Sequence, residues 1–132
     1  VGFCHGMLTR AANALTDVLA AIKSLITLSR VVGFDETVLR AGPAGAKRYV
    51  LSASTETATV YHLGGRDLDS FSKAGILPSF AGTAVHDRYA NYFHRRWEHL
   101  AGHQACNAHL IRDFADAAET ILAALLALDA AR

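Results

Sequence analysis

The sequence predicts an α/β domain in which an antiparallel three-strand meander and further parallel strands form one mixed sheet, flanked by helices and preceded by a long helix. Three observations predict it: β-branched apolar runs in the middle of the chain, helical periodicity at both ends, and helix-like stretches between the later strands. A length of 132 residues is enough for one domain with its own core and too little for two. With 52% hydrophobic and 19% charged residues, the composition excludes a disordered chain.

The first helix is expected over residues 7–28, where apolar side chains recur every three or four positions. Its stripe consists of Leu8, Ala11, Leu15, Val18, Ile22 and Leu25. A stripe of this length packs either on the core of the same chain or on a second copy, and the pattern leaves both open. Residues 1–30 are therefore expected to form an N-terminal amphipathic helix, followed by the domain proper over residues 31–132.

Short apolar runs with frequent Val, Thr and Tyr, bounded by turn residues, predict five strands. The expected strands are residues 31–36, 47–54, 57–63, 82–87 and 102–106. The second and third are joined by a short turn at Thr55 and Glu56, which predicts a β-hairpin. The stretch 41–45, rich in glycine and proline, is expected to be a loop.

Three further helices are expected between and after these strands. A short helix covers residues 67–74 and ends at Gly75. The next covers residues 89–100, and the last covers residues 107–128 with Asn107 as its N-cap. The apolar stripe of the last helix is Leu110, Phe114, Ala117, Ile121 and Leu125.

The order of these elements predicts how the strands are arranged. Strands joined by short turns run antiparallel, whereas strands reached through a helix run parallel to the first strand. If the fourth strand pairs beside the first, the result is the ribonuclease-H-like arrangement, and Asp35 and Asp87 at the two strand ends become neighbours. A carboxylate at the end of a buried strand is costly unless it is paired, and a divalent cation is the usual partner. Asp35 and Asp87 are therefore the candidate catalytic and metal-binding residues, with Mg²⁺ or Mn²⁺ as the cofactor.

Five segments carry a resemblance to a known family, in order and at compatible spacing. They are Phe34-Asp35-Glu36-Thr37, Leu51-Ser52-Ala53-Ser54-Thr55, Gly75-Ile76-Leu77-Pro78-Ser79-Phe80-Ala81-Gly82, Val85-His86-Asp87-Arg88-Tyr89-Ala90-Asn91-Tyr92 and Cys106-Asn107-Ala108-His109-Leu110-Ile111-Arg112. From residue 31 to residue 119 the chain resembles the catalytic core of bacterial insertion-sequence transposases, and most of all the insertion-sequence-66 family.

That resemblance implies a ribonuclease-H-like fold and acidic-triad (DDE) transposition, with Asp35 and Asp87 as the first two catalytic acids. Metal ions held by the two carboxylates would activate the attacking hydroxyl and stabilise the leaving oxygen during DNA cleavage and strand transfer. The third acid of the family, a glutamate, lies downstream of Arg132, so the chain is expected to be a C-terminally truncated fragment that is inactive alone. The implied partners are DNA at the transposon ends and a second copy of the chain, with no small-molecule cofactor and no membrane.

Other residues near the two aspartates are candidates for supporting roles. Glu36 follows Asp35 on the same strand and points to the other face, so it is expected to support the site without binding the metal. Cys106 and His109, three positions apart at a helix start, either bind a zinc ion or form a buried thiol and a capping histidine. The resemblance implies that this pair lies near the catalytic centre.

The segment over residues 86–112 is locally basic although the net charge of the whole chain is only +1. Its arginines, Arg88, Arg95, Arg96 and Arg112, are candidate contacts to DNA phosphates. The alternative is an ordinary solvated face. In the same way, the alternative to a catalytic core is a non-catalytic module that dimerises or binds nucleic acid.

The expected location is the bacterial cytoplasm, in association with DNA. The two cysteines are far apart in the sequence and form no disulfide framework, which fits a reducing compartment. The apolar run near the C-terminus is far shorter than the ~20 residues that span a bilayer.

Overall fold

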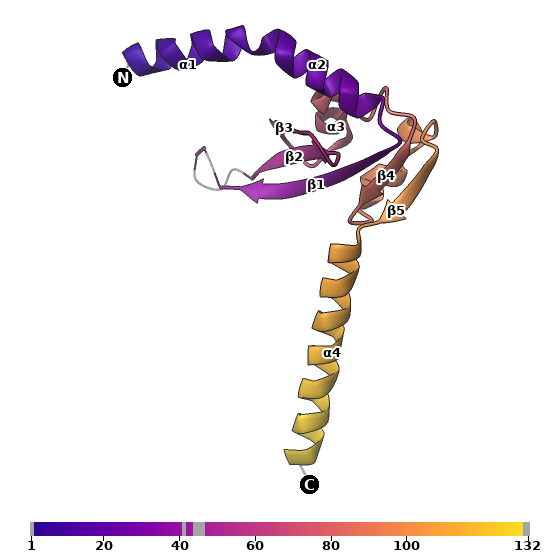
Figure 1. The fold of residues 1–132 in the computed structure, drawn as a ribbon. Helices are drawn as coiled ribbons and strands as arrows, with labels where there is room; N and C mark the ends of the chain where they lie inside the picture. The colour runs from indigo at the N-terminus through magenta and orange to yellow at the C-terminus, as the bar shows by residue number, and fades with distance from the viewer. Residues whose placement is uncertain (1, 41, 44–46, 131–132) are drawn as a thin grey trace.

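The sheet contains strands of both directions, which confirms the predicted mixed α/β fold. The structure is a computed structural model that describes residues 2–40, 42–43 and 47–130. Within these residues the strands are β1 (Val31–Leu39), β2 (Arg48–Ser54), β3 (Thr59–Gly64), β4 (Thr83–His86) and β5 (Gly102–Ala105), in the order β3-β2-β1-β4-β5 (Figure 1). β2 pairs antiparallel with β1 and β3, whereas β4 pairs parallel with β1 and β5. The loop predicted over 41–45 lies partly outside the described residues.

Three of the four predicted helices are present, but the first begins at Gly2 and is broken into two. The helices are α1 (Gly2–Ala14), α2 (Thr16–Thr27), α3 (Leu68–Ala74) and α4 (Asn107–Ala130), together with the 3-10 helices η1 (Ala90–Phe93) and η2 (Arg95–Trp97). The single helix predicted over residues 7–28 is divided at Leu15, whose N–H is shared between the carbonyls of Ala11 and Ala12, at 3.2 Å each. The helix tightens for one residue there, and α1 and α2 follow one another as a bent rod (Figure 1).

The prediction of an α-helix over residues 89–100 is wrong. This segment forms η1 and η2, which are separated by His94 in an extended conformation, with φ −69° and ψ 143°. His94 Nδ1 accepts a hydrogen bond from the N–H of Arg96 at 3.2 Å. The indole N–H of Trp97 donates to the carbonyl of Asn91 at 2.9 Å. These side chains therefore take backbone groups that a continuous α-helix would need for its own ladder.

The start of the last helix also differs from the prediction. Asn107 is the first residue of α4 and not its N-cap. The carbonyl of Cys106 accepts the N–H of Leu110 at 3.1 Å, so Cys106 takes the capping position. The N–H of Cys106 is bonded, at 2.8 Å, to the carbonyl of His86 at the end of the sheet, so α4 starts directly where the strand pairing stops.

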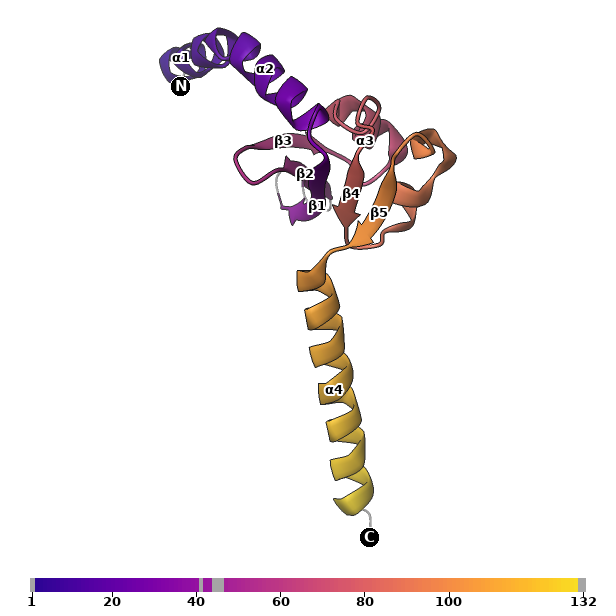
Figure 2. The ribbon, with the colours of Figure 1, turned by 45° about the vertical axis from the view of Figure 1, so that its right-hand side comes forward.

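The hydrophobic core lies on one face of the sheet, where α2, α3 and the 3-10 helices cover it (Figure 2). Its buried members are Ile26, Val32, Phe34, Leu51, Ala53, Val60, Phe71, Ile76, Leu77, Phe80, Ala84, Tyr92 and Trp97. α3 is held at both ends: the Asp67 side chain accepts the N–H of Ser70 at 2.9 Å, and Gly75 ends the helix with φ 86°. Glycine adopts this left-handed conformation without a steric penalty, so the predicted helix stop is confirmed.

The opposite face of the sheet and two of the helices are uncovered. On that face Tyr61 is 70% exposed, and neither α1 nor α4 has a buried residue. Figures 1 and 2 show both helices projecting away from the sheet, in different directions. No helix in the described part of the chain combines the length and the apolar character that a bilayer crossing requires.

Candidate active site

The two aspartates singled out from the sequence lie on neighbouring strands, Asp35 in the middle of β1 and Asp87 directly after β4, because β1 continues beyond the predicted residue 36 to Leu39. β1 and β4 pair in parallel with Gly33 opposite Val85, and continuing this register by two residues places Asp35 beside Asp87. Successive side chains of a strand alternate between the two faces of the sheet, so Asp35 and Asp87 project from the same face, opposite to the face that buries Phe34 and His86. The side chain of Asp35 is 49% exposed and that of Asp87 is 21% exposed.

Asp87 is held by hydrogen bonds on both carboxylate oxygens. Its Oδ2 accepts from Arg66 Nη2 at 2.8 Å, and its Oδ1 accepts from the N–H of Tyr89, also at 2.8 Å. Arg88, which lies between Asp87 and Tyr89 in the chain, has φ 70°, a left-handed conformation that is uncommon outside glycine. The turn after β4 therefore folds the backbone onto the carboxylate and fixes it.

Arg66 links Asp87 to the buried carboxylate of Glu36. Its Nε donates to Glu36 Oε2 at 2.9 Å, and the hydroxyl of Tyr92 donates to the other oxygen of Glu36. The Glu36 side chain is 1% exposed, and burial raises its pKa against the opposing effect of these hydrogen bonds. Burial also raises the pKa of Tyr92, with the charge of Glu36 as the next cause. Glu36 thus lies on the core side of β1, and its connection to Asp87 runs through Arg66.

The start of α4 lies next to Asp35. His109 Nε2 is 3.7 Å from Asp35 Oδ1. Continuing the β4–β5 register by one residue places Cys106 beside Asp87. Hydrogen bonds from the side chain and the backbone of His109 lower the pKa of the Cys106 thiol. The structure therefore brings these four sequence-predicted residues together beside the C-terminal ends of β4 and β5.

His86, the residue before Asp87, forms a hydrogen-bonded pair with His103. The hydrogen bonds of His86 indicate which of its ring nitrogens carries the proton. His86 Nδ1 accepts the N–H of Arg88 at 3.1 Å, so neutral His86 carries its proton on Nε2. Nε2 lies 3.0 Å from His103 Nδ1 and donates to it. The His86 ring stacks on Tyr92 with the ring centroids 4.3 Å apart. Burial and, to a smaller extent, His103 lower the pKa of His86, which favours its neutral form.

The four candidate DNA-contacting arginines come from three parts of the chain. Arg88 follows β4, and Arg112 lies on α4. Arg95 and Arg96 belong to η2. Arg88 and Arg96 each form an ion pair with an aspartate, whereas Arg95 and Arg112 have no ion-pair partner among the described residues. Two of the four charges are therefore partly neutralised within the chain.

The donor set at this site suits a hard cation. Asp35 and Asp87 offer carboxylate oxygens, and Mg²⁺ is commonly bound by one or two carboxylates together with waters or substrate phosphates. Over residues 2–40, 42–43 and 47–130, no group of three or more His, Cys, Asp or Glu side chains is arranged to hold a metal ion. The zinc alternative for Cys106 and His109 therefore lacks its further ligands in this part of the chain.

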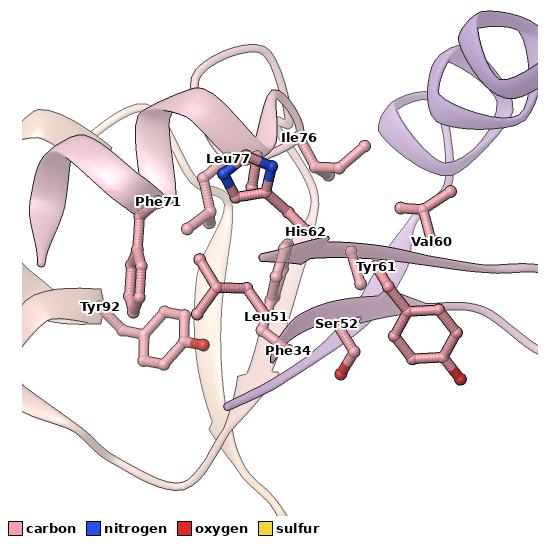
Figure 3. Close-up of a pocket in the computed structure, with 12 residues that line it drawn as sticks. Phe34, Leu51, Ser52, Val60, Tyr61, His62, Phe71, Ile76, Leu77 and Tyr92 are labelled. Carbon is pink, nitrogen blue, oxygen red and sulfur yellow. The ribbon is translucent and has the colours of Figure 1, made fainter. Parts of the chain in front are cut away.

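A small apolar cavity lies under β2 and β3 and not at the aspartates (Figure 3). Its volume is about 20 Å³, and its walls include Phe34, Leu51, Phe71, Ile76, Leu77 and Tyr92. A buried water needs roughly 10–15 Å³ of such space and several polar partners. This cavity is therefore a packing gap of the core and not a substrate pocket.

Arg66 and Tyr92 belong to the site although the sequence analysis does not predict them. β3 runs in the same direction as β1, because both are antiparallel to β2. Arg66 follows β3 by two residues and so emerges at the end of the sheet toward which β1 also runs. A basic residue just after a strand parallel to β1 is the signal that identifies Arg66. Tyr92 lies in the 3-10 segment, where the predicted α-helix gives no correct direction for its side chain.

The fold and the site define an α/β protein with two carboxylates side by side on adjacent parallel strands. The sequence profile of the family described as Transposase IS66 family matches residues 2–130. The chain therefore belongs to the transposase IS66 family, and its function is related to transposition. The match includes α1 and α2, which lie before the segment that carries the resemblance. Searches of curated proteins and of solved structures found no match.

Proposed function

We propose that the chain forms part of a catalytic core for metal-dependent cleavage and strand transfer of DNA, built on a ribonuclease-H-like sheet. The observation that supports this most is the parallel pairing of β1 and β4, whose register aligns Asp35 with Asp87. Membership of a transposase family supports DNA as the substrate. The two carboxylates would hold Mg²⁺ or Mn²⁺.

The residues of the chain itself would bind the cation and orient its carboxylate ligands. Arg66 and the N–H of Tyr89 fix the Asp87 carboxylate, and His109 lies beside Asp35. When bound, a divalent cation supplies Lewis-acid stabilisation of the charge that develops on phosphate oxygens. Arg88, Arg95, Arg96 and Arg112 are proposed contacts to DNA phosphates. A second copy of the chain is the proposed partner of the exposed helix α4.

The test of this proposal is cation binding by Asp35→Asn and Asp87→Asn proteins. We expect the wild-type protein to bind Mn²⁺ and each variant to bind it at least tenfold more weakly, because each loses one anionic oxygen ligand. Neighbouring carboxylates repel each other in the metal-free protein, so millimolar Mg²⁺ or Mn²⁺ should also raise the wild-type melting temperature. Isothermal titration calorimetry and thermal unfolding measure the two effects.

Asp17→Asn is the control, because Asp17 lies on α2 and is exposed. It should leave both the Mn²⁺ affinity and the metal-dependent rise in melting temperature unchanged. Wild-type binding that persists in both active-site variants would contradict the proposal. The non-catalytic alternative, a module that binds nucleic acid or a second copy without cutting, would then be the better description.

A further inference from the structure

Arg66 bridges two carboxylates of very different exposure. Its Nε donates to Glu36 Oε2 at 2.9 Å, and its Nη2 donates to Asp87 Oδ2 at 2.8 Å. The Glu36 side chain is 1% exposed, whereas that of Asp87 is 21% exposed. One guanidinium group therefore connects an acid fixed in the core to an acid at the accessible edge of the sheet.

The orientation of Arg66 is fixed from several sides. Its carbonyl accepts hydrogen bonds from the Tyr89 hydroxyl at 3.1 Å and from Asn91 Nδ2 at 3.2 Å. Its guanidinium carbon lies 3.9 Å from the centroid of the Tyr89 ring. Swinging the guanidinium away would leave the buried charge of Glu36 without a cation, which is strongly unfavourable. Arg66 is therefore a rigid donor and not a mobile surface charge.

The charge of Arg66 does not by itself exclude a metal ion from Asp87. Glu36 and Arg66 together carry no net charge, so Asp87 keeps its own negative charge available. An ionised carboxylate has about four lone-pair positions. Arg66 and the N–H of Tyr89 each use one of them, on different oxygens. Positions on both oxygens therefore remain open while the plane of the carboxylate is set.

We propose that Arg66 is a positioning residue that holds the Asp87 carboxylate in the orientation used for cation binding, with Glu36 as its buried anchor. This inference rests on the proposed function, because it assigns Arg66 a role toward a cation at Asp87. Groups that orient metal ligands through hydrogen bonds typically change metal affinity by about 10–100-fold when they are removed. The opposite possibility, that Arg66 competes with the cation, predicts tighter binding when Arg66 is lost.

The test replaces Arg66 by methionine, which keeps much of the side-chain stem and removes the donors. We expect Arg66→Met to weaken Mn²⁺ binding by about tenfold or more, in keeping with the general effect of such groups. Without metal, the amide of Tyr89 should exchange its hydrogen faster, because the Asp87 oxygen that it bonds is no longer held in place. Arg66→Lys should fall between Arg66→Met and the wild type, since one ammonium cannot reproduce both guanidinium bonds.

A control variant and a matched pair of variants keep the test decisive. Arg10→Met removes an exposed arginine of α1 and should change neither measurement. If Arg66→Met does not fold because Glu36 is left buried and charged, the pair Glu36→Gln and Glu36→Gln/Arg66→Met gives the same comparison with a neutral anchor. Unchanged or tighter Mn²⁺ binding in the protein that lacks Arg66 would overturn the inference.

The outcomes separate this inference from the proposed function. If the wild type binds no Mn²⁺, the metal-dependent function fails, and an unchanged Tyr89 exchange rate in Arg66→Met protein then overturns the positioning role as well. If the wild type binds Mn²⁺ through Asp35 and Asp87 but Arg66→Met binds it equally well, only the inference about Arg66 fails.

Discussion

At the scale of single residues, charge balance decides which polar groups are buried at the edge of the sheet. Glu36 is almost inaccessible because Arg66 and the Tyr92 hydroxyl satisfy its two oxygens. Asp87 shares Arg66 and is less exposed than Asp35, whose Oδ1 lies 3.7 Å from His109 Nε2. The burial of each acid therefore follows the cations and donors that face it.

His86 makes the stability of the fold depend on pH. Burial lowers its pKa in the folded chain, so between this value and the unfolded value of 6.5 the unfolded chain binds more protons. We predict that the free energy of unfolding is constant with respect to His86 above pH 6.5 and falls as the pH drops below it. His86→Asn keeps an acceptor for the N–H of Arg88 but cannot be protonated. It should reduce the slope by up to about 1.4 kcal/mol per pH unit, as measured by urea unfolding across this range.

His94→Asn is the matched control for that experiment. His94 Nδ1 accepts the N–H of Arg96 at 3.2 Å, just as His86 Nδ1 accepts the N–H of Arg88. In both cases the donor lies two residues further along the chain, but the His94 bond is exposed. This variant should keep the wild-type slope. The same slope in His86→Asn and wild-type protein would show that His86 does not link proton uptake to unfolding.

The two aspartates are predicted from the sequence, whereas Arg66 is missed because its signal depends on the strand arrangement. Asp35 and Asp87 each follow an apolar run, which a short stretch of sequence encodes, although β1 continues to Leu39 beyond the predicted end at residue 36. The partners of Arg66 lie 30 and 21 residues away in the chain, and only the strand register brings them together. The roles of Asp35, Asp87, Glu36, Cys106 and His109 in metal-dependent chemistry stay predictions until cation binding is measured.

At the scale of elements, the strands and α3 follow local signals, and the largest error occurs where side chains bond to the backbone. The helix predicted over residues 89–100 fails because His94 and Trp97 take backbone groups of their own segment. Periodicity describes which residues share a face, but it does not register such bonds. α3 succeeds because its cap at Asp67 and its stop at Gly75 are chemically distinctive.

Gly75 provides a prediction for α3. A Cβ at this position would lie 3.7 Å from Lys23 Nζ, an ordinary contact, so a substitution meets no clash. The cost of Gly75→Ala is then that of the backbone at φ 86°, roughly 1–2 kcal/mol. We expect a melting temperature lower by several degrees and a smaller loss for Gly75→Asn, since asparagine tolerates this conformation better. Thermal unfolding measures both.

Gly33→Ala is the control for the backbone argument. Gly33 lies in β1, and a Cβ there would be 3.8 Å from the nearest atom, the carbonyl oxygen of Ser54. Because alanine in a strand loses less conformational entropy on folding than glycine, this variant should be neutral or slightly more stable. A Gly75→Ala protein as stable as Gly33→Ala would refute the assignment of the cost to the left-handed conformation.

At the scale of the whole molecule, one face of the sheet is buried, whereas the helices α1 and α4 project from the domain and are exposed. The core is contributed by the sheet, α2, α3 and the 3-10 helices, while α1 and α4 contain no buried residue. Along α4, apolar side chains recur with alternating spacings of three and four residues. They are Ile111, Phe114, Ala118, Ile121, Leu125 and Leu128. This is the 3.5-residue repeat of helices that pack on one another, and its large members are exposed.

If a second copy of the chain covers this stripe, a charge within it should prevent association. We predict that the wild-type protein self-associates with increasing concentration and that Leu125→Glu weakens this association at least tenfold, because Leu125 is 58% exposed in the single chain and would be buried in the pair. Ala123→Glu adds the same charge two residues earlier, about 200° around the helix and therefore away from the stripe, and should associate like the wild type. Sedimentation velocity over a range of concentrations distinguishes these cases. Equal weakening by both substitutions would implicate net charge and not the stripe, and a wild-type protein that stays monomeric throughout would exclude a second copy as the partner of α4.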